Sequence, residues 1–193
     1  MNIRFDKSFI KTLRDVNQHE HEVTSNLFDS ISNIRTIITL RLERSMEKGL
    51  LNKRLVGLFL GAGHESRRWP TDKFVEMAQM LASEGTGIAV LLGPEERGMR
   101  DGLHDRFGSY AVVLEEAPIP LFLALLAKMN VVVSGDTGPM HLAAVAGCAI
   151  VLLSHAGAPD IFHPLAEKLI ILDETPLADI EAGTVADAVR KLL

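Results

Sequence analysis

Residues 131–144 read VVVSGDTGPMHLAA, and this segment is the most informative about the type of fold. Its three valines form a β-branched run ending at Ser134, and this run predicts a strand buried on both faces. Gly135 and Gly138 permit tight backbone conformations in the turn that follows. Pro139 suits the first turn of a helix, because its missing N–H would have no helical partner there. The stretch therefore predicts a strand, a tight turn and a helix in succession.

The same alternation of short apolar runs and longer amphipathic stretches continues on both sides of this unit. The expected strands are 55–60, 87–92, 111–114, 131–134, 150–153 and 169–172. Helices are expected between them, and Thr71 or Asp72 is expected to cap the first one. Apolar strands that alternate with helices are typical of parallel sheets. We therefore expect an α/β fold, a Rossmann-like doubly wound parallel sheet of about six strands.

The chain divides into two parts near residue 54. Residues 1–53 carry charges throughout, contain no strand–helix unit, and show helical patterning over 21–31 and 42–51. Residues 54–193 contain all the strand–helix units and are long enough for one complete domain. A helical arm leading into a complete domain suggests that another segment normally precedes it.

Composition limits the function classes. The net charge of −5 argues against a nucleic-acid-binding surface. No apolar run approaches the roughly 20 residues needed to span a bilayer, and the start lacks the apolar core of a secretion signal, so we expect a cytoplasmic protein. Cys148 lies in an Ala/Val/Ile run, which favours a small buried residue over a nucleophile.

The turn after Ser134 is the sharpest candidate site, because ligands of doubly wound sheets bind at the carboxyl ends of the strands. The N–H groups of Thr137 and Gly138 can face a ligand at the positive end of the helix, and Thr137 adds a hydroxyl. His141 lies in the first turn, where a neutral imidazole can donate a ring N–H. These features predict a diphosphate cradle. The alternative is a well-capped turn, in which Asp136 bonds its own backbone and His141 has a packing role.

The turn after the first expected strand, LGAGHESRRWP at residues 60–70, contains glycines that allow close backbone approach, among them Gly63. It delivers Arg67 and Arg68 to the sheet edge that carries the cradle, where a cation could neutralise phosphate. The stretch is not a dinucleotide-binding fingerprint, because Ser66 stands where the third glycine should be. The alternative for either arginine is a solvated surface charge.

The turn after the second expected strand, LLGPEER at residues 91–97, offers Glu96 or Glu95 as an acceptor for ribose hydroxyls. An acid there can also simply complement a helix dipole. The histidines lack ligand spacing, so we predict no metal site. His155 and His163 flank the loop after the fifth strand and are candidates for a sugar or phosphate contact.

Taken together, these motifs resemble a known family. GAGHESRRWP after a strand, then LLGPEE, then VVVSGDTGPMHLAAVAG, in this order and spacing, resemble the carboxyl-terminal domain of glycosyltransferase family 9, the heptosyltransferases of lipopolysaccharide core assembly. HEVTSNL at residues 21–27 resembles the family's segment near the domain crossover, and residues 40–53 resemble the helix leading into the second domain. The resemblance covers about residues 17–193.

The resemblance implies a GT-B architecture, in which two Rossmann-like domains face each other across a cleft. Residues 1–53 would be a helical linker or remnant of the acceptor-binding domain, and residues 54–193 the nucleotide-sugar-binding domain. The family transfers heptose with inversion and needs no metal-dependent motif. Its general base is an aspartate of the first domain, and this chain is expected to lack most of that domain. The catalytic residue therefore stays unassigned, and the chain is expected to supply the donor-binding half.

Carried over by position, the resemblance gives roles to individual residues. Thr137 and Gly138 would bind the donor diphosphate, Asp136 would bond sugar hydroxyls, and Glu96 would hold the ribose. Arg67 stands where the family usually has a lysine, which keeps the charge but changes its geometry. The expected donor-binding residues are Gly63, Arg67, Glu96, Asp136, Thr137, Gly138 and His141.

The expected function is transfer of a sugar, heptose by resemblance, from a nucleotide-diphospho-sugar such as ADP-heptose to a lipopolysaccharide core or related glycan acceptor. The alternative is a non-catalytic nucleotide-sugar-binding or docking module. An oxidoreductase is disfavoured by the broken glycine fingerprint. Expected partners are the donor, a glycan or glycolipid acceptor, and a separate amino-terminal domain or further copies of the chain. The expected location is the cytoplasm, including the periphery of the inner membrane.

Overall fold

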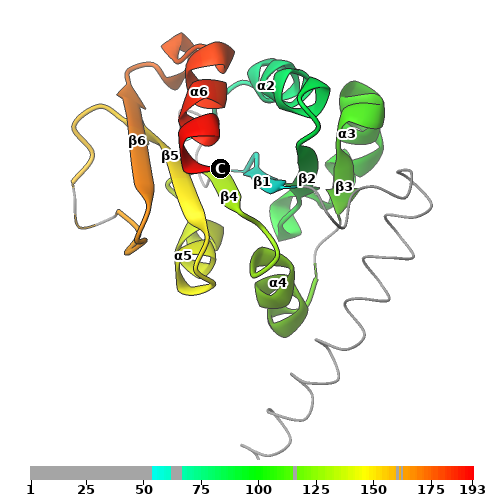
Figure 1. The fold of residues 1–193 in the computed structure, drawn as a ribbon, viewed down its shortest axis with the longest axis horizontal. Helices are drawn as coiled ribbons and strands as arrows, with labels where there is room; N and C mark the ends of the chain where they lie inside the picture. The colour runs from blue at the N-terminus through cyan, green and yellow to red at the C-terminus, as the bar shows by residue number, and fades with distance from the viewer. Residues whose placement is uncertain (1–53, 62–66, 115–116, 160, 162) are drawn as a thin grey trace, which may run out of the picture.

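Six parallel strands lie side by side in the order β3-β2-β1-β4-β5-β6 (Figure 1). The computed structural model describes residues 54–61, 67–114, 117–159, 161 and 163–193. The strands are β1 (Leu55–Phe59), β2 (Gly87–Leu91), β3 (Val112–Leu114), β4 (Val131–Gly135), β5 (Ala149–His155) and β6 (Leu169–Glu174). The order reverses between β1 and β4, which creates the switch point where such sheets bind ligands. The predicted doubly wound α/β fold is confirmed.

Helices cover both faces of the sheet. The α-helices are α2 (Thr71–Ser83), α3 (Arg100–Phe107), α4 (Ile119–Leu126), α5 (Gly138–Val145) and α6 (Ala182–Leu192), with 3-10 turns η3 (Pro94–Met99), η4 (Gly108–Tyr110) and η6 (Leu177–Asp179). In Figure 1, α2, α3 and α6 lie on one side of the sheet, and α4 and α5 lie on the other. The result is a three-layer domain.

The core follows from the alternation of side chains along the central strands. In β4, Val131 and Val133 join the apolar cluster under α2 and α6, and Val132 joins the cluster under α4 and α5. All three valines are fully buried. The uninterrupted apolar run that predicted burial on both faces is therefore explained by helices on both faces.

The start of α2 differs from the sequence prediction. The helix begins at Thr71 itself, Pro70 is its N-cap, and no side chain caps it. Instead, the preceding Trp69 anchors the helix entry. Its indole Nε1 donates to the carbonyl of Ile180 at 3.0 Å, and its ring meets Phe74 edge-on with centroids 4.7 Å apart. The entry of α2 is thus fixed by contacts of Trp69 with Phe74 and with Ile180, just before α6.

The turn after β4 also differs from expectation in one respect. Neither Gly135 nor Gly138 has a positive φ; among the described residues, the glycines that do are Gly85, Gly108, Gly147 and Gly157. A Cβ on Gly135 would lie 3.4 Å from the carbonyl oxygen of Arg67. The lack of a side chain at Gly135 therefore allows the turns after β4 and β1 to approach closely. A left-handed backbone is not the reason for this glycine.

The predicted arm, residues 1–53, lies outside the described residues, and its separation from residues 54–193 as a domain stays a prediction. Over the part of the chain that is described, none of the helices has the length and apolar content required to traverse a bilayer.

Candidate functional site

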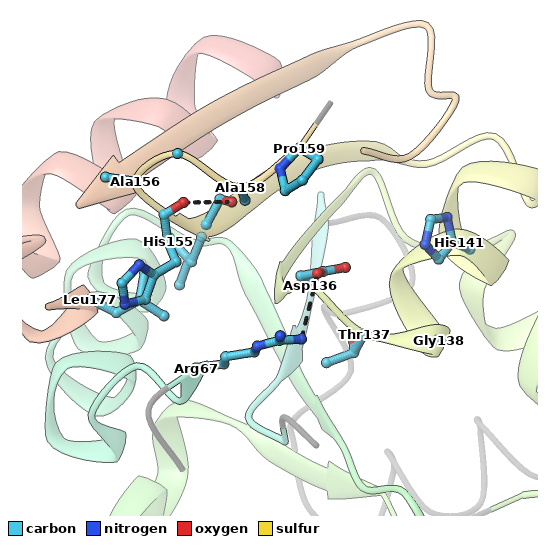
Figure 2. Close-up of a pocket in the computed structure, with 13 residues that line it drawn as sticks. Arg67, Asp136, Thr137, Gly138, His141, His155, Ala156, Ala158, Pro159 and Leu177 are labelled. Atoms are coloured by element: carbon cyan, nitrogen blue, oxygen red, sulfur yellow. Dashed lines mark hydrogen bonds and ion pairs between the residues drawn. The ribbon is translucent and has the colours of Figure 1, made fainter. Parts of the chain in front are cut away.

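A cleft of about 570 Å³ opens at the carboxyl edge of β1, β4 and β5 (Figure 2). It lies at the switch point of the sheet, beside the turns that follow β1 and β4. Its lining residues are Arg67, Asp136, Thr137, Gly138, His141, Leu153, Ser154, His155, Ala156, Gly157, Ala158, Pro159 and Leu177. Five of the seven predicted donor-binding residues are among them.

Arg67 and Asp136 form the charged centre of the cleft. One guanidinium nitrogen of Arg67 lies 4.0 Å from a carboxylate oxygen of Asp136. The Arg67 side chain is 59% exposed and that of Asp136 is 27% exposed. The sequence predicted that the turns after β1 and β4 would meet at this edge, and they do. A pair this long and this exposed holds little stabilising energy, so the guanidinium can turn to an incoming anion at low cost.

Thr137 is held by a hydroxyl chain at the end of β4. The buried Ser134 Oγ donates to the carbonyl of Gly135 at 2.8 Å, and it lies 3.1 Å from Thr137 Oγ1. Because Ser134 has one hydroxyl proton, Thr137 is the donor in the second bond. The Thr137 hydroxyl thus already has a protein partner, and its backbone N–H is the more direct donor to a ligand.

The amino end of α5 faces the same space. Thr137 is the N-cap, with extended backbone, and no side chain caps the helix. The first N–H groups of a helix lack helical partners and carry the positive end of the dipole. A Cβ on Gly138 would meet no atom within 4 Å, so the cleft is open at that point. His141 is exposed one turn into the helix and borders the cleft, as predicted.

The turn after β5 forms the opposite wall. The Ala158 N–H donates to the carbonyl of His155 at 3.0 Å, and Gly157 has a φ of +80°. His155 Nδ1 lies 2.8 Å from Thr175 Oγ1, which fixes the ring from the end of β6. Figure 2 places His141 and His155 at opposite ends of the cleft. The sequence singled out His155 but missed the wall formed by residues 156–159; Gly157 followed by Ala-Pro was the available signal.

One predicted residue among those described, Glu96, does not line this cleft. The Gly93 N–H donates to Glu96 Oε2 at 2.9 Å, and Glu96 is only 8% exposed. Its carboxylate lies over Gly61, where a Cβ would overlap it. Glu96 thus lies beyond β1, at the ends of β1 and β2, and its ribose role stays a prediction. Gly63 lies outside the described residues.

Cys148 and the carboxylates offer no second chemistry among the described residues. Burial raises the pKa of the Cys148 thiol to about 11, and Sγ donates to the carbonyl of Leu126 at 3.1 Å. This confirms the interpretation of Cys148 as a buried, unreactive residue. Within the described ranges, no three His, Cys, Asp or Glu side chains gather as metal ligands would. The absence of a metal requirement stays a prediction.

Known proteins share this fold and sequence pattern. Residues 11–186 match the sequence model of glycosyltransferase family 9 (heptosyltransferase). Lipooligosaccharide heptosyltransferase 2 of Haemophilus influenzae is 26% identical over 133 residues, which cover 65% of this chain and 38% of that protein. The protein of the same name from Haemophilus ducreyi is 26% identical over 129 residues, which cover 63% of this chain and 37% of that one. The chain thus spans about two fifths of the length of these curated relatives.

Solved structures agree on the fold. ADP-heptose lipopolysaccharide heptosyltransferase II of E. coli superposes with a TM-score of 0.67 at 20% identity, covering 80% of this chain and 50% of that chain. The family 9 glycosyl transferase of Veillonella parvula superposes with a TM-score of 0.72 at 18% identity, covering 85% and 51%. The family match extends over most of the sequence, including every turn that borders the cleft. This chain belongs to glycosyltransferase family 9, the heptosyltransferase family.

Proposed function

We propose that this chain is the donor-binding half of a heptosyltransferase, which transfers heptose from ADP-heptose to a lipopolysaccharide core or related glycan acceptor. One observation carries the proposal most directly. A cation, Arg67, and the open amino end of α5 border one cleft at the switch point of the sheet. Both features favour an anion, and the volume of about 570 Å³ is in the range of small-molecule sites.

The pyrophosphate would rest against the backbone N–H groups of Thr137 and Gly138. Arg67 would turn from Asp136 to the phosphate oxygens, and a ring N–H of His141 would donate to them from the first turn of α5. When the glycosidic bond breaks, negative charge develops on the leaving diphosphate. Preorganised donors aimed at that charge stabilise the transition state more than the bound donor, so these residues would serve both binding and transfer.

Asp136 has a different role in this proposal. Its carboxylate would accept hydrogen bonds from hydroxyls of the transferred sugar, which places the sugar beside the pyrophosphate. Glu96, at the ends of β1 and β2, remains the candidate for the ribose hydroxyls. Gly63 would allow the turn after β1 to approach the donor closely.

The acceptor site and the general base would lie on another domain. The E. coli and Veillonella parvula structures extend to about twice the matched length, which leaves room for such a domain. An inverting transfer needs a base beside the attacking hydroxyl, in line with the leaving group. We place the reaction in the cytoplasm, at the inner-membrane surface where a glycolipid acceptor is accessible, without a metal cofactor.

Calorimetric titration of the chain with ADP, ADP-heptose and UDP-sugars tests the proposal. Saturable binding of ADP-heptose and ADP, with weaker binding of UDP-sugars, is expected. No saturable binding of any nucleotide sugar would overturn it.

The alternative, a non-catalytic binding or docking module, predicts the same titration. Adding the amino-terminal domain of a family 9 relative separates the two functions. Sugar transfer in the mixture, absent with either part alone, supports the transferase half. Tight donor binding without transfer in the mixture supports the binding module.

A further inference from the structure

The outer edge of β6 is unusual for an edge strand. β6 is the last strand of the sheet and pairs on its inner side with β5 (Figure 1). The first four of its six residues, LIIL at 169–172, contain no proline or charge, and the strand then ends in Asp173 and Glu174; Ile171 is 36% exposed. Proteins usually protect edge strands with charges, prolines or bulges because an open edge pairs with other strands. We propose that β6 is an interaction surface that pairs antiparallel with β6 of a second copy of this chain.

The backbone bonds to β5 identify the groups that face outward. The Ile150 N–H donates to the carbonyl of Lys168 at 2.9 Å, and the Ala156 N–H donates to that of Glu174 at 3.4 Å. Bonding groups in a parallel ladder alternate between the two sides of a strand, so residues 168, 170, 172 and 174 face β5. Leu169, Ile171 and Asp173 therefore direct their N–H and C=O outward. Within the described residues, none of these outward groups has a hydrogen bond.

A two-fold axis at Ile171 satisfies all of these groups at once. In that register Ile171 faces Ile171 of the second copy, and Leu169 faces Asp173. Directly opposed residues of an antiparallel pair exchange both backbone bonds when their groups face each other. Three outward residues in each copy thus pair completely, in a closed arrangement that uses the same surface twice.

The side chains support the same register. Lys168 and Glu174 lie three residues on either side of Ile171, so each Lys168 falls opposite Glu174 of the other copy. Both side chains are exposed, and neither has an ion pair within the described part of the chain. Ile170 and Leu172, which pack on the α2–α6 side of the sheet, fall opposite each other. Opposite charges and apolar pairs at directly opposed positions stabilise strand pairing, and a shift of register by two residues would lose the two charge pairs.

Charge reversal at the two ends of the strand tests this pairing. Sedimentation equilibrium of the wild-type chain is expected to show a reversible dimer with Kd on the order of micromolar, as a small interface gives. Lys168→Glu alone and Glu174→Lys alone each place like charges opposite each other twice, and each is expected to weaken the dimer at least tenfold. Mixing these two variants restores opposite charges at both ends, so heterodimers form. Uniform isotope labelling of one of the two variants gives the heterodimer a mass of its own, which native mass spectrometry detects.

Val145→Lys on α5 is the matched control, because Val145 is an exposed apolar residue away from β6, at 81% exposure. This variant is expected to dimerise like the wild type. Circular dichroism checks that all variants keep the fold, which these exposed positions should not disturb. A monomeric wild type at several hundred micromolar, or single variants that dimerise as well as their mixture, would overturn the proposal.

Discussion

Arg67 and Asp136 face each other at 4.0 Å across the point where the turns after β1 and β4 meet. The two residues are 69 positions apart in the sequence, and the order of the strands brings them together. An exposed pair of this length contributes little to folding. The pair matters locally, because it places the Arg67 guanidinium beside the amino end of α5. There, an anionic ligand such as a phosphate could replace the Asp136 carboxylate as its partner.

Arg67→Ala should weaken binding of ADP-heptose and of ADP alike, because the guanidinium is assigned to the pyrophosphate that both contain. The expected loss is about 1.5–3 kcal/mol, typical of hydrogen bonds to a charged group. Calorimetric titration measures it. Arg106→Ala is the control, since Arg106 pairs with Asp72 on the surface of α2 and α3. Equal affinity in the Arg67 variant and the control would contradict the assignment.

Asp136→Ala should separate the two ligands. Its carboxylate is assigned to sugar hydroxyls, so affinity for ADP-heptose should fall by about tenfold or more. Affinity for ADP should stay the same or rise, because a negative charge beside the phosphates is removed. Titrations of both ligands with this variant and with Asp136→Asn give the comparison. An equal loss for both ligands would place the carboxylate elsewhere.

Gly138→Leu tests whether the ligand occupies the open space beside the amino end of α5. A Cβ here meets no protein atom within 4 Å, and the backbone φ is not positive, so the fold should tolerate a side chain. The melting temperature should therefore hold, while a side chain projecting into the cleft displaces the pyrophosphate and lowers donor affinity at least tenfold. Gly102→Leu, on α3 and also open, is the control. Unimpaired donor binding by Gly138→Leu would show that the ligand lies elsewhere.

Cys148 makes stability depend on pH in the alkaline range. Its pKa is raised from 9.0 to about 11 by burial, so the unfolded chain loses this proton first. The thiol's contribution is complete below pH 9 and is lost as pH rises from 9 through 11. Denaturant unfolding at pH 8 and pH 10.5 should show a fall in stability that Cys148→Ala lacks. An identical pH slope in both proteins would show that the thiol does not control it.

The elements of the fold were readable from sequence because the strands begin as apolar runs and the two longest helices, α2 and α6, are amphipathic. The exact ends of the strands and helices were harder to predict. β5 and β6 each extend beyond their predicted ends, to His155 and Glu174, because ladder bonds continue where the side chains become polar. The entry of α2 was not predictable from local sequence, since Trp69 there bonds to the carbonyl of Ile180, 111 positions away.

The candidate site was predicted in the same uneven way. Arg67, Asp136 and Thr137 were predicted to lie together because they belong to the turns after β1 and β4, at one edge of the sheet. The wall at residues 156–159 was missed, since Gly157 and Ala-Pro signal a turn but carry no side-chain group that points to a ligand. Glu96 illustrates a further limit: an acid after β2 was visible in the sequence, but its bond to the Gly93 N–H depends on the local turn.

A crystal structure of the chain with bound ADP-heptose would show where the pyrophosphate lies. We expect its oxygens within hydrogen-bonding distance of the N–H groups of Thr137 and Gly138, and of the Arg67 guanidinium. A pyrophosphate that touches only one of these two turns, or that binds at another edge of the sheet, would contradict this expectation.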